Sequence, residues 1–266
     1  MQNNNSPIGI FDSGIGGTSI WNEIATVLPN EKTIYLSDSK NAPYGTKSKE
    51  SIIELSKKNT EFLLNKGCKL IVVACNTATT NAIKYLRASY PVPFIGIEPA
   101  IKPASIKTKT NIVGVLATKG TLTSELFAKT SSILRGKTSI KEVEGEGLVE
   151  LIEAGKIKSK EMENLLTKYL NPLLDSGIDC LVLGCTHYPY LIPEIKKIIG
   201  NKIQIIDSGQ AVARQTKAVL QQHKILTTST RIASHQFFIN KEKSILETII
   251  SNSLSIKNNT INQLDF

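Results

Sequence analysis

Two of the four cysteines, Cys75 and Cys185, stand in the same local sequence setting. Each ends a short apolar run, in VVACNTATT at 72–80 and in LVLGCTHYP at 181–189, and small hydroxylic or polar residues follow. Each also precedes a segment with helical spacing, and a thiol near a helix N-terminus has its thiolate favoured by the dipole and free amides. The repetition predicts two reactive thiols. The alternative is two buried structural cysteines that happen to end strands.

Two equivalent thiols suit the chemistry of a racemase. Such an enzyme removes a proton from one face of a carbon and returns one to the opposite face, so two groups of similar acidity work in either direction. The ordinary pKa of a thiol, about 8.5, lets it act as base or acid near neutral pH. A thiol hydrolase would need one thiol, one base and an oxyanion hole, with no use for a second thiol.

Each thiol has a candidate partner in the sequence. His187 lies two residues after the second thiol, whereas His223 and His235 have no motif around them and are interpreted as structural. Asp12 ends the first predicted strand, so its carboxylate can point into the same cleft as the first thiol. A helix N-cap is the alternative role for this aspartate.

Short polar side chains supply candidate hydrogen-bond donors. Asn76, Thr77 and Thr186 are residue types that cap helix N-termini. The α-proton of an amino acid is a very weak acid, so removing it requires pre-placed donors that stabilise a carbanion-like transition state. Backbone amides at the two helix starts and the hydroxyls of Ser13, Thr77 and Thr186 are available. No lysine motif for pyridoxal phosphate occurs, so no electron-sink cofactor is indicated.

Two turn segments complete the set of candidate site elements. FDSGIGG at 11–17 is a glycine-rich strand-to-helix turn, whose amides can bind a carboxylate or a phosphate. It is a poor dinucleotide fingerprint because Ser19 holds the third glycine position, and an ordinary tight turn explains it equally well. APYGT at 42–46 follows the second predicted strand and brings Tyr44 and Gly45 to the same sheet edge, although PYG alone indicates a turn.

The elements that would position these residues alternate between strand and helix. Apolar, β-rich runs predict strands at Ile8–Phe11, Thr33–Leu36, Leu70–Ala74, Phe94–Ile97, Ile112–Leu116, Ile140–Val143, Cys180–Gly184 and Ile203–Ile206. Helical spacing predicts helices near 18–28, 48–66, 78–89, 121–135, 159–176, 189–200 and 209–222. Short continuous apolar strands separated by helices favour a parallel sheet covered on both faces.

The chain also resembles itself. IGIFDSGIGGTS at 8–19 aligns with VGVLATKGTLTS at 113–124, and GCKLIVVACNT at 67–77 aligns with GIDCLVLGCTH at 177–187. The repeat predicts an α/β fold of two pseudo-symmetric domains, each with a mainly parallel sheet flanked by helices. We expect a discontinuous first domain of residues 1–98 plus 208–266 and a second domain of residues 99–207. Ligands of such sheets bind beyond the carboxyl ends of the strands, so the site is expected in the cleft between the domains.

Composition restricts the possible settings. The chain has 266 residues, of which 41% are hydrophobic and 21% charged. No apolar run approaches the roughly 20 residues that span a bilayer, and the N-terminus lacks a secretory pattern, so a cytoplasmic protein without membrane association is expected. Without CxxC or paired histidine spacing, neither a zinc site nor any other metal is expected, and a cytosolic disulfide is disfavoured.

The net charge of +9 raises the question of a nucleic-acid partner. The lysines are scattered and lack a basic helix or aromatic-basic alternation, so we interpret them as solvated faces and expect no nucleic acid. A weak anion preference and a DNA-associated role are the alternatives.

Four motifs together resemble those of glutamate racemase, in the aspartate/glutamate racemase family. They are FDSGIGG at 11–17, SDSKNAPYG at 37–45, VVACNTAT at 72–79 and LGCTHYP at 183–189, and the resemblance covers nearly the whole chain. It implies cofactor-independent interconversion of L- and D-glutamate, which supplies D-glutamate for peptidoglycan. Related aspartate racemases share the two cysteines but usually lack FDSGIGG, which ranks glutamate above aspartate as substrate.

The resemblance also implies residue roles. Cys75 would take the α-proton from D-glutamate with help from Asp12, and Cys185 would take it from L-glutamate with help from His187. The amino acid would be bound by Asp12, Ser13, Tyr44, Gly45, Asn76, Thr77, Thr186 and His187. Thr118 and Thr121 in ATKGT match a further family pattern. Glu153 matches the usual acidic residue, although the loop before it, in GEGLVELIEAG at 145–155, departs from the family.

Other interpretations stay open at this point. A racemase of aspartate or another acidic amino acid would share the two thiols, and a substrate panel would distinguish it. A catalytically silent carboxylate-binding protein would bind without exchanging protons. Related enzymes are often dimers, which allows a homodimer, but the sequence indicates no dimer face.

Overall fold

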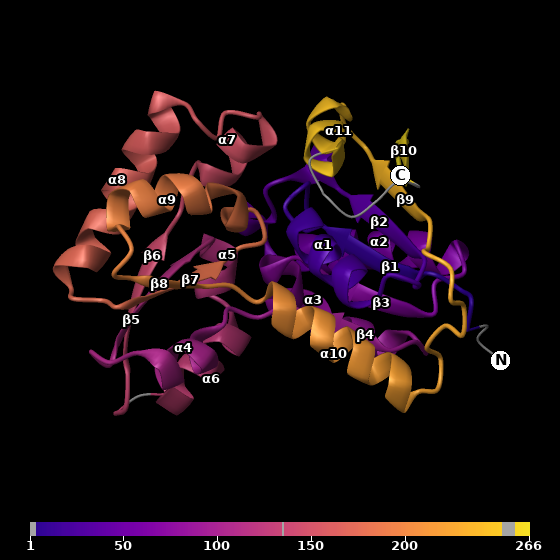
Figure 1. The fold of residues 1–266 in the computed structure, drawn as a ribbon, viewed down its shortest axis with the longest axis horizontal. Helices are drawn as coiled ribbons and strands as arrows, with labels where there is room; N and C mark the ends of the chain where they lie inside the picture. The colour runs from indigo at the N-terminus through magenta and orange to yellow at the C-terminus, as the bar shows by residue number, and fades with distance from the viewer. Residues whose placement is uncertain (1–3, 135, 252–258) are drawn as a thin grey trace.

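A computed structural model describes residues 4–134, 136–251 and 259–266 and divides their strands between two sheets, one in each lobe of Figure 1. The first sheet has the order β10-β9-β2-β1-β3-β4. Its strands are β1 (Ile8–Asp12), β2 (Thr33–Ser37), β3 (Leu70–Val73), β4 (Phe94–Gly96), β9 (His235–Ile239) and β10 (Asn259–Gln263).

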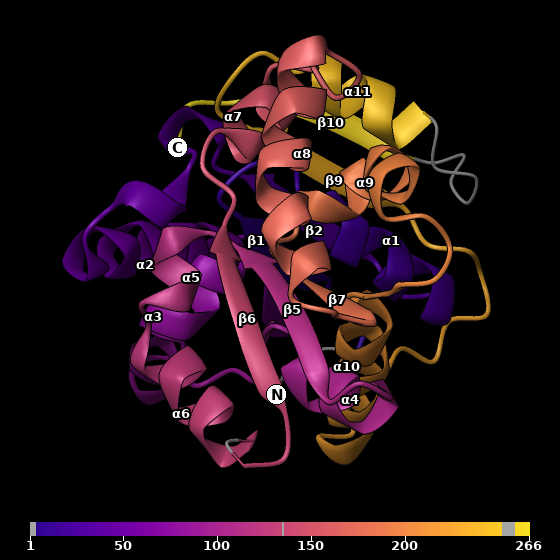
Figure 2. The same cartoon turned by 90° about the vertical axis from the view of Figure 1, so that its left-hand side faces the viewer.

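The second sheet repeats the β2-β1-β3-β4 order of the first. It consists of β5 (Ile112–Ala117), β6 (Ser139–Glu144), β7 (Cys180–Gly184) and β8 (Gln204–Ile206), in the order β6-β5-β7-β8. Figure 2 shows its edge strand β6 facing the viewer. Every strand pairing in the described ranges is parallel. The predicted strands are all present, and Cys75 and Cys185 follow the equivalent strands β3 and β7.

Helices cover both faces of each sheet. Those of the first lobe are α1 (Thr18–Val27), α2 (Lys49–Asn65), α3 (Asn76–Ser89), α10 (Gly209–Gln222) and α11 (Ser244–Ser251). Those of the second lobe are α4 (Ile101–Lys107), α5 (Lys119–Leu122), α6 (Glu125–Leu134), α7 (Leu148–Glu153), α8 (Lys160–Asp175) and α9 (Ile192–Ile199). Three short 3₁₀ turns, η1 (Ser39–Asn41), η2 (Tyr44–Thr46) and η3 (Tyr188–Leu191), lie after strands. The architecture confirms the predicted fold class.

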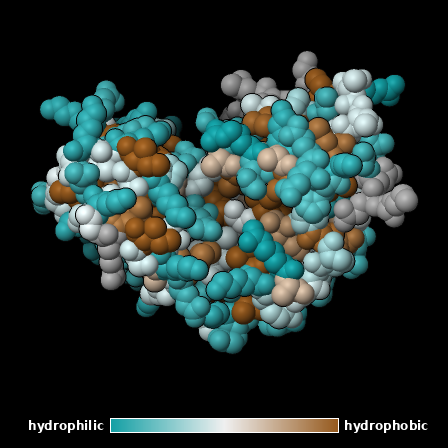
Figure 3. Space-filling view, turned by 90° about the horizontal axis from the view of Figure 1, so that it is seen from below, coloured by the Kyte–Doolittle hydropathy of each residue, from teal (hydrophilic) through white to brown (hydrophobic). Residues whose placement is uncertain are grey.

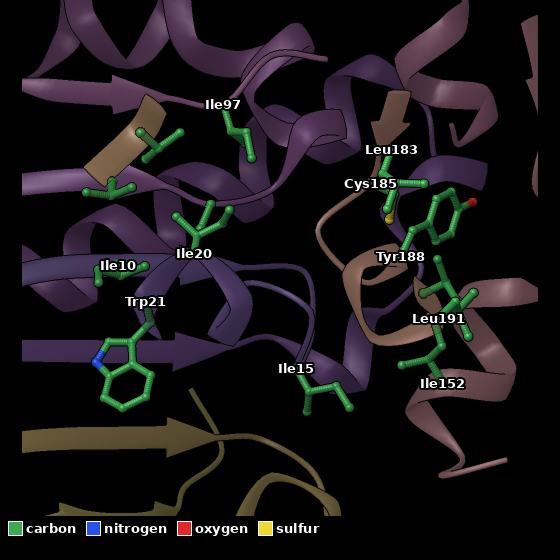
Figure 4. Close-up of a cluster of buried hydrophobic side chains, with 14 of the residues drawn as sticks. Ile10, Ile15, Ile20, Trp21, Ile97, Ile152, Leu183, Cys185, Tyr188 and Leu191 are labelled. Atoms are coloured by element: carbon green, nitrogen blue, oxygen red, sulfur yellow. The ribbon is translucent and has the colours of Figure 1, made fainter. Parts of the chain in front are cut away.

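Successive strand residues alternate between two layers of the core. In β1, Ile10 packs in the cluster that includes α1 and α10, whereas Phe11 packs in the cluster that includes α2 and α3. The second sheet divides in the same way. Leu116 packs in the cluster that includes α8 and α9, whereas Val115 packs in the cluster that includes α4 and α6. The cluster that contains Ile10 and Leu116 is continuous across both lobes, as Figure 4 shows from Trp21 to Leu191. This burial on both faces explains why the central strands β1, β3 and β7 have nearly continuous apolar sequences.

Two predicted helices differ in detail from the structure. The helix expected over 121–135 is divided into α5 and α6, because the Ser124 side chain accepts a hydrogen bond from the Phe127 amide at 3.2 Å and caps a new helix. Residue 135 lies outside the described residues. The helix expected over 189–200 begins as the 3₁₀ turn η3 before α9.

The C-terminal part of the chain returns to the first lobe. Strand β9 pairs with β2 from Thr33↔His235 to Ser37↔Ile239. The Thr33 hydroxyl lies 2.8 Å from His235 Nδ1, and Trp21 packs edge-on against Phe237 at 4.7 Å between ring centroids. Strands β9 and β10 thus belong to the first sheet, and the expected division into domains stays a prediction. No helix in the described ranges has the length and apolar character needed to cross a membrane.

Candidate active site

Both thiols line one small cavity between the lobes. Figure 3 shows the molecule hollowed between the two lobes. The lining residues are Ser13, Pro43, Tyr44, Gly45, Cys75, Asn76, Thr77, Thr118, Val149, Cys185, Thr186 and His187. The centre of a water molecule can move within a volume of about 10 Å³, which leaves room for about one water. An amino acid is larger than this space, so the groups that line it must move before one can enter.

Most residues predicted for substrate binding lie in this lining. The exception is Asp12, which is fully buried behind it. Among the further candidates, Thr118 lines the cavity directly. Thr121 and Glu153 do not, but each contacts a lining residue, Thr77 and His187 respectively.

Cys75 occupies the N-cap of α3. Its sulfur accepts a hydrogen bond from the Ala78 amide at 3.4 Å, and its thiol donates to Ser13 Oγ at 3.5 Å. The prediction that Asn76 and Thr77 cap this helix is therefore wrong, because the thiol itself does so. Burial raises the pKa of Cys75 well above its usual value, and the charge of Asp12 raises it further. The expected preference for thiolate does not hold here, because desolvation outweighs the helix N-terminus.

Asp12 connects the glycine-rich loop to the second lobe. Its Oδ2 accepts hydrogen bonds from the amides of Gly14 at 3.2 Å and Gly17 at 2.9 Å. Its Oδ1 accepts one from the Thr186 hydroxyl at 3.2 Å, so Thr186 is not the helix cap that was predicted. Asp12 is not the N-cap of α1 either, since that position is Gly17. Burial raises the pKa of Asp12 to about 6, partly offset by the charge of His187.

Cys185, His187 and Glu153 form a second constellation. The sulfur lies 3.8 Å from His187 Nδ1, and His187 Nε2 lies 2.6 Å from Glu153 Oε1. Burial alone would lower the pKa of His187, but the contacts with Cys185 and Glu153 outweigh it and hold this pKa well above its usual value. Burial would raise the pKa of Glu153, yet the His187 contact and other hydrogen bonds lower it. The arrangement favours an imidazolium between the sulfur and a carboxylate.

Glu153 also reaches across to the first lobe. Its Oε1 accepts a hydrogen bond from the Ile15 amide at 2.7 Å, and its Oε2 accepts one from the Ser39 hydroxyl at 2.8 Å. The glycine-rich loop was expected to offer its amides to a carboxylate or a phosphate. In the structure three of them, the amides of Gly14, Ile15 and Gly17, donate to carboxylates from within the chain.

Close approach of the second lobe explains two glycines of this loop. A Cβ on Gly14 would lie 2.0 Å from Glu153 Oε1, and a Cβ on Gly16 would lie 2.2 Å from His187 Nδ1. Neither glycine is among those with positive φ. The loop therefore needs glycine for space rather than for an unusual backbone conformation.

The polar side chains in and next to the cavity differ in how many hydrogen bonds they make. The hydroxyls of Thr77, Thr118 and Thr121 form a cluster across the lobes, with Thr77 2.8 Å from Thr118 and 3.3 Å from Thr121. Asn76 is 3% exposed and lines the cavity, yet neither polar atom of its side chain has a hydrogen-bond partner within the described residues. A buried unpaired amide of this kind is suited to bind a ligand.

A network that the sequence interpretation missed supports Tyr44. Its hydroxyl donates to Asp38 Oδ2 and accepts from Asn59 Nδ2 at 3.1 Å. Asn240 Nδ2 donates to the other oxygen of Asp38 at 2.6 Å, and the Lys40 amide donates to Asn240 Oδ1 at 2.8 Å. The motif at 37–45 contains Asp38, which was a signal for part of this network, but nothing near Asn240 pointed to it.

The remaining cysteines and histidines lie outside the cavity. Cys68 and Cys180 are free and buried, as small hydrophobic cysteines are expected to be. Burial lowers the pKa of His235 to about 4, and its ring contacts Thr33. His223 is exposed at the end of α10. Within the described part of the chain no group of three His, Cys, Asp or Glu residues is placed to hold a metal ion.

The chain is similar to known proteins over most of its length. The model of the Asp/Glu/Hydantoin racemase family matches residues 15–216. The glutamate racemase of Cupriavidus pinatubonensis is 42% identical over 254 residues, which are 96% of this chain and 93% of that protein.

Two solved structures share the fold. A glutamate racemase isoform from Bacillus anthracis superposes with a TM-score of 0.88 at 32% identity and covers 99% of both chains. The Escherichia coli glutamate racemase, solved with L-glutamate and the activator UDP-MurNAc-ala, superposes with a TM-score of 0.85 at 31% identity. That comparison covers 97% of this chain and 98% of the other.

Proposed function

The chain belongs to the glutamate racemases of the Asp/Glu/Hydantoin racemase family, and we propose that it interconverts L- and D-glutamate by proton transfer at two thiols. The observation that carries the two-thiol mechanism is the placement of Cys75 and Cys185 in the lining of one cavity. They reach it from equivalent strand ends in the two lobes, so an α-carbon between them would have one thiol on each face.

In the direction from L- to D-glutamate, Cys185 is the base. An imidazolium at His187, with Nδ1 3.8 Å from the sulfur, is complementary to a negatively charged sulfur. The sulfur takes the α-proton, and the electron pair left on the α-carbon accepts a proton from the thiol of Cys75 on the opposite face. The product is D-glutamate, with a thiol at Cys185 and a thiolate at Cys75.

The reverse direction starts from a thiolate at Cys75. Because burial and the Asp12 charge raise the pKa of this thiol, the thiolate is strongly basic and needs a proton acceptor to form. Asp12, whose pKa of about 6 leaves it ionised at neutral pH, is the nearby carboxylate that can assist this exchange. Cys185 then returns the proton to the other face and gives L-glutamate.

Substrate binding falls to the polar lining of the cavity. The unpaired side-chain amide of Asn76 can both donate to a carboxylate and accept from an ammonium group. The hydroxyls of Ser13, Thr77 and Thr186 and the Tyr44–Gly45 turn are the further groups that we assign to the amino acid. Fixed donors of this type stabilise negative charge that develops beside the α-carbon.

The product of the proposed reaction defines its cellular role. We assign to the chain the supply of D-glutamate for peptidoglycan, in keeping with the muramic acid nucleotide that activates the E. coli relative. Complementation of a bacterial strain that requires D-glutamate for growth tests this role separately from the chemistry.

The decisive experiment follows the α-proton in D₂O. With no cofactor added, we expect NMR to show deuterium from the solvent entering the α position, whichever enantiomer of glutamate is the substrate. The optical rotation of either starting solution should decay to zero. The variants Cys75→Ala and Cys185→Ala are expected to lose racemisation. The matched controls Cys68→Ala and Cys180→Ala also remove buried thiols but lie outside the cavity, and they are expected to keep it.

Three results would overturn parts of the proposal. Exchange with aspartate but not glutamate would replace the substrate and leave the mechanism in place. Binding of glutamate without any exchange would point to a silent carboxylate-binding protein. Full racemisation by either cavity-thiol variant would refute the two-thiol mechanism itself.

A further inference from the structure

We infer that Tyr35 is a positioning residue for the Cys185 side of the site. Its hydroxyl binds the Gly14–Ile15 peptide unit, whose N–H donates a hydrogen bond to Glu153. This inference rests on the proposed racemase function. Tyr35 lies in the middle of β2 and does not line the cavity, so it touches no substrate in this role.

The hydroxyl of Tyr35 lies directly beneath the glycine-rich loop. It donates a hydrogen bond to the Gly14 carbonyl oxygen at 2.7 Å, and the residue is fully buried. A Cβ on Gly17 would lie 2.9 Å from the same hydroxyl oxygen. The ring packs against the Phe237 ring at 5.8 Å between centroids, which restrains the side chain that carries the hydroxyl.

The Gly14 carbonyl and the Ile15 amide belong to one peptide unit. A trans peptide is planar, so its C=O and N–H point in opposite directions. Holding the carbonyl oxygen toward Tyr35 therefore directs the N–H of Ile15 toward the second lobe. There it donates to Glu153 Oε1 at 2.7 Å.

From Glu153 the contacts lead to the thiol. The same Oε1 lies 2.6 Å from His187 Nε2, and the other ring nitrogen lies 3.8 Å from Cys185 Sγ. The orientation of one peptide in the first lobe thus helps to place an imidazole in the second lobe. Ser39 restrains the other Glu153 oxygen, so loss of the Tyr35 hydroxyl weakens this arrangement without abolishing it.

Tyr35 acts as a fixed donor and exchanges no proton in this role. Burial raises its pKa well above the usual value, and the nearby charge of Asp12 raises it further. The hydroxyl therefore stays protonated across the working pH range. In this role its removal acts through the geometry of the loop and Glu153.

The test compares Tyr35→Phe with Tyr90→Phe. Both lose one tyrosine hydroxyl hydrogen bond, but Tyr90 bonds to Glu61 on the surface, away from the cavity. We expect Tyr35→Phe to lower kcat/KM roughly tenfold, because the Gly14 carbonyl loses its buried partner. Tyr90→Phe is expected to match the unchanged protein, and thermal unfolding checks that both variants fold.

Isotope effects separate a positioning role from general loosening. The enantiomers have equal free energies, so kcat/KM is the same in both directions and cannot report on one thiol. Slowing the Cys185 step raises the deuterium isotope effect with α-deuterated L-glutamate and lowers it with α-deuterated D-glutamate. Equal changes in both effects, or none, would contradict the inference.

A double-variant cycle identifies the route. If Tyr35 acts through Glu153, adding Tyr35→Phe to Glu153→Gln lowers activity much less than adding it to the unchanged protein. If the two substitutions instead lower the activity independently, so that their fold-losses multiply, the inference would be overturned while the racemase proposal stays intact. Failure of the unchanged protein to exchange glutamate α-protons would instead remove the proposed function on which the inference rests.

Discussion

Equivalent cysteines at the ends of β3 and β7 have different immediate neighbours. Cys75 contacts a serine hydroxyl and a helix amide, with a carboxylate nearby. Cys185 has the imidazole of His187, backed by Glu153. Local sequence alone suggested two similar thiols, but their acid–base settings differ because the neighbours come from distant parts of the chain.

The first prediction concerns the ionisation of Asp12. Its pKa is raised from 3.8 to about 6, so its carboxylate becomes protonated as pH falls through about 6. We expect kcat/KM to fall along an acid limb near that pH in the unchanged protein. Asp12→Asn should lose roughly 100-fold in kcat/KM at neutral pH and lack this limb. A limb that persists in the variant would assign it to another group.

The same shift has a consequence for stability. A raised pKa means that the folded state binds the proton more tightly than the unfolded state does. Protonation of Asp12 therefore contributes to the free energy of unfolding, and this contribution is fully present below pH 3.8 and is lost as pH rises through about 6. Asp12→Asn removes that dependence. Denaturant unfolding between pH 4 and 7 should therefore show a flatter pH dependence for the variant, and an unchanged slope would contradict this account.

The second prediction concerns the lack of space for a side chain at Gly16. The methyl of Gly16→Ala would lie 2.2 Å from His187 Nδ1 and must displace the imidazole. We expect kcat to fall at least 100-fold with a loss of about 1–3 kcal/mol in the free energy of unfolding. Gly209→Ala, whose nearest new contact is the flexible Glu23 side chain at 3.1 Å, is the control. Equal activity in the two variants would contradict a spatial requirement at Gly16.

At the scale of elements, the buried strands could be predicted from the sequence, whereas exposed strands and short helices could not. Strands buried on both faces have continuous apolar runs, and these were identified. The pattern of β10 is NTINQ, half exposed at a sheet edge, and β9 follows a polar linker, so neither was predicted. Helices α4, α7 and α11 have only six to eight residues, too few for a clear helical period.

The third prediction concerns the C-terminal return at the end of β9. Asn240 bonds to Asp38 and to the Lys40 amide, and Asp38 in turn holds the Tyr44 hydroxyl. Asn240→Ala should raise KM for glutamate roughly fivefold with little change in kcat, because the Tyr44 turn loses support. Asn262→Ala, which removes one side-chain bond to the Phe237 carbonyl at 3.4 Å, is the matched control. A fall in kcat alone would argue against this role.

At the scale of the whole molecule, the contacts between lobes were the part that sequence could not predict. The internal repeat indicated two similar halves, and the carboxyl ends of their strands placed both thiols at one edge. The pairing of Glu153 with Ile15 depends on how the lobes face each other, which no local pattern encodes. The resemblance indicated Glu153, but only the fold shows its contact with the opposite lobe.

The fourth prediction follows from the small cavity. We expect the lobes to separate when substrate enters, so the Ile15 amide should exchange with solvent deuterium much faster than the Ala74 amide, which bonds to Phe11 within the sheet. Saturating D-glutamate should slow exchange at Ile15 and leave Ala74 unchanged. NMR-detected exchange measures both amides at once. Equal rates at the two positions would show that the lobes do not open locally at this contact.

The fifth prediction concerns a buried ion pair far from the site. Lys69 Nζ lies 2.7 Å from Glu31 Oε2, with both side chains buried, and the other Glu31 oxygen accepts from the Thr227 amide. Glu31→Ala leaves a buried ammonium without its counter-ion, with the Asn4 carbonyl oxygen as a remaining hydrogen-bond acceptor, and should cost about 3–5 kcal/mol of unfolding free energy. The double variant Glu31→Leu with Lys69→Met should recover much of this loss in denaturant unfolding. Equal stability of the two variants would contradict an uncompensated charge.

The pairing of β2 with β9 has a consequence for synthesis of the chain. Strands β5 to β8 are contiguous in sequence and can pair as soon as they leave the ribosome, whereas β2 must wait for His235 and the residues after it. Until then the edge of β2 is open, and an unpaired strand edge is a template for aggregation. A transcript truncated before β9 should therefore yield aggregated protein rather than a smaller active enzyme, although both cysteines of the cavity would already be present.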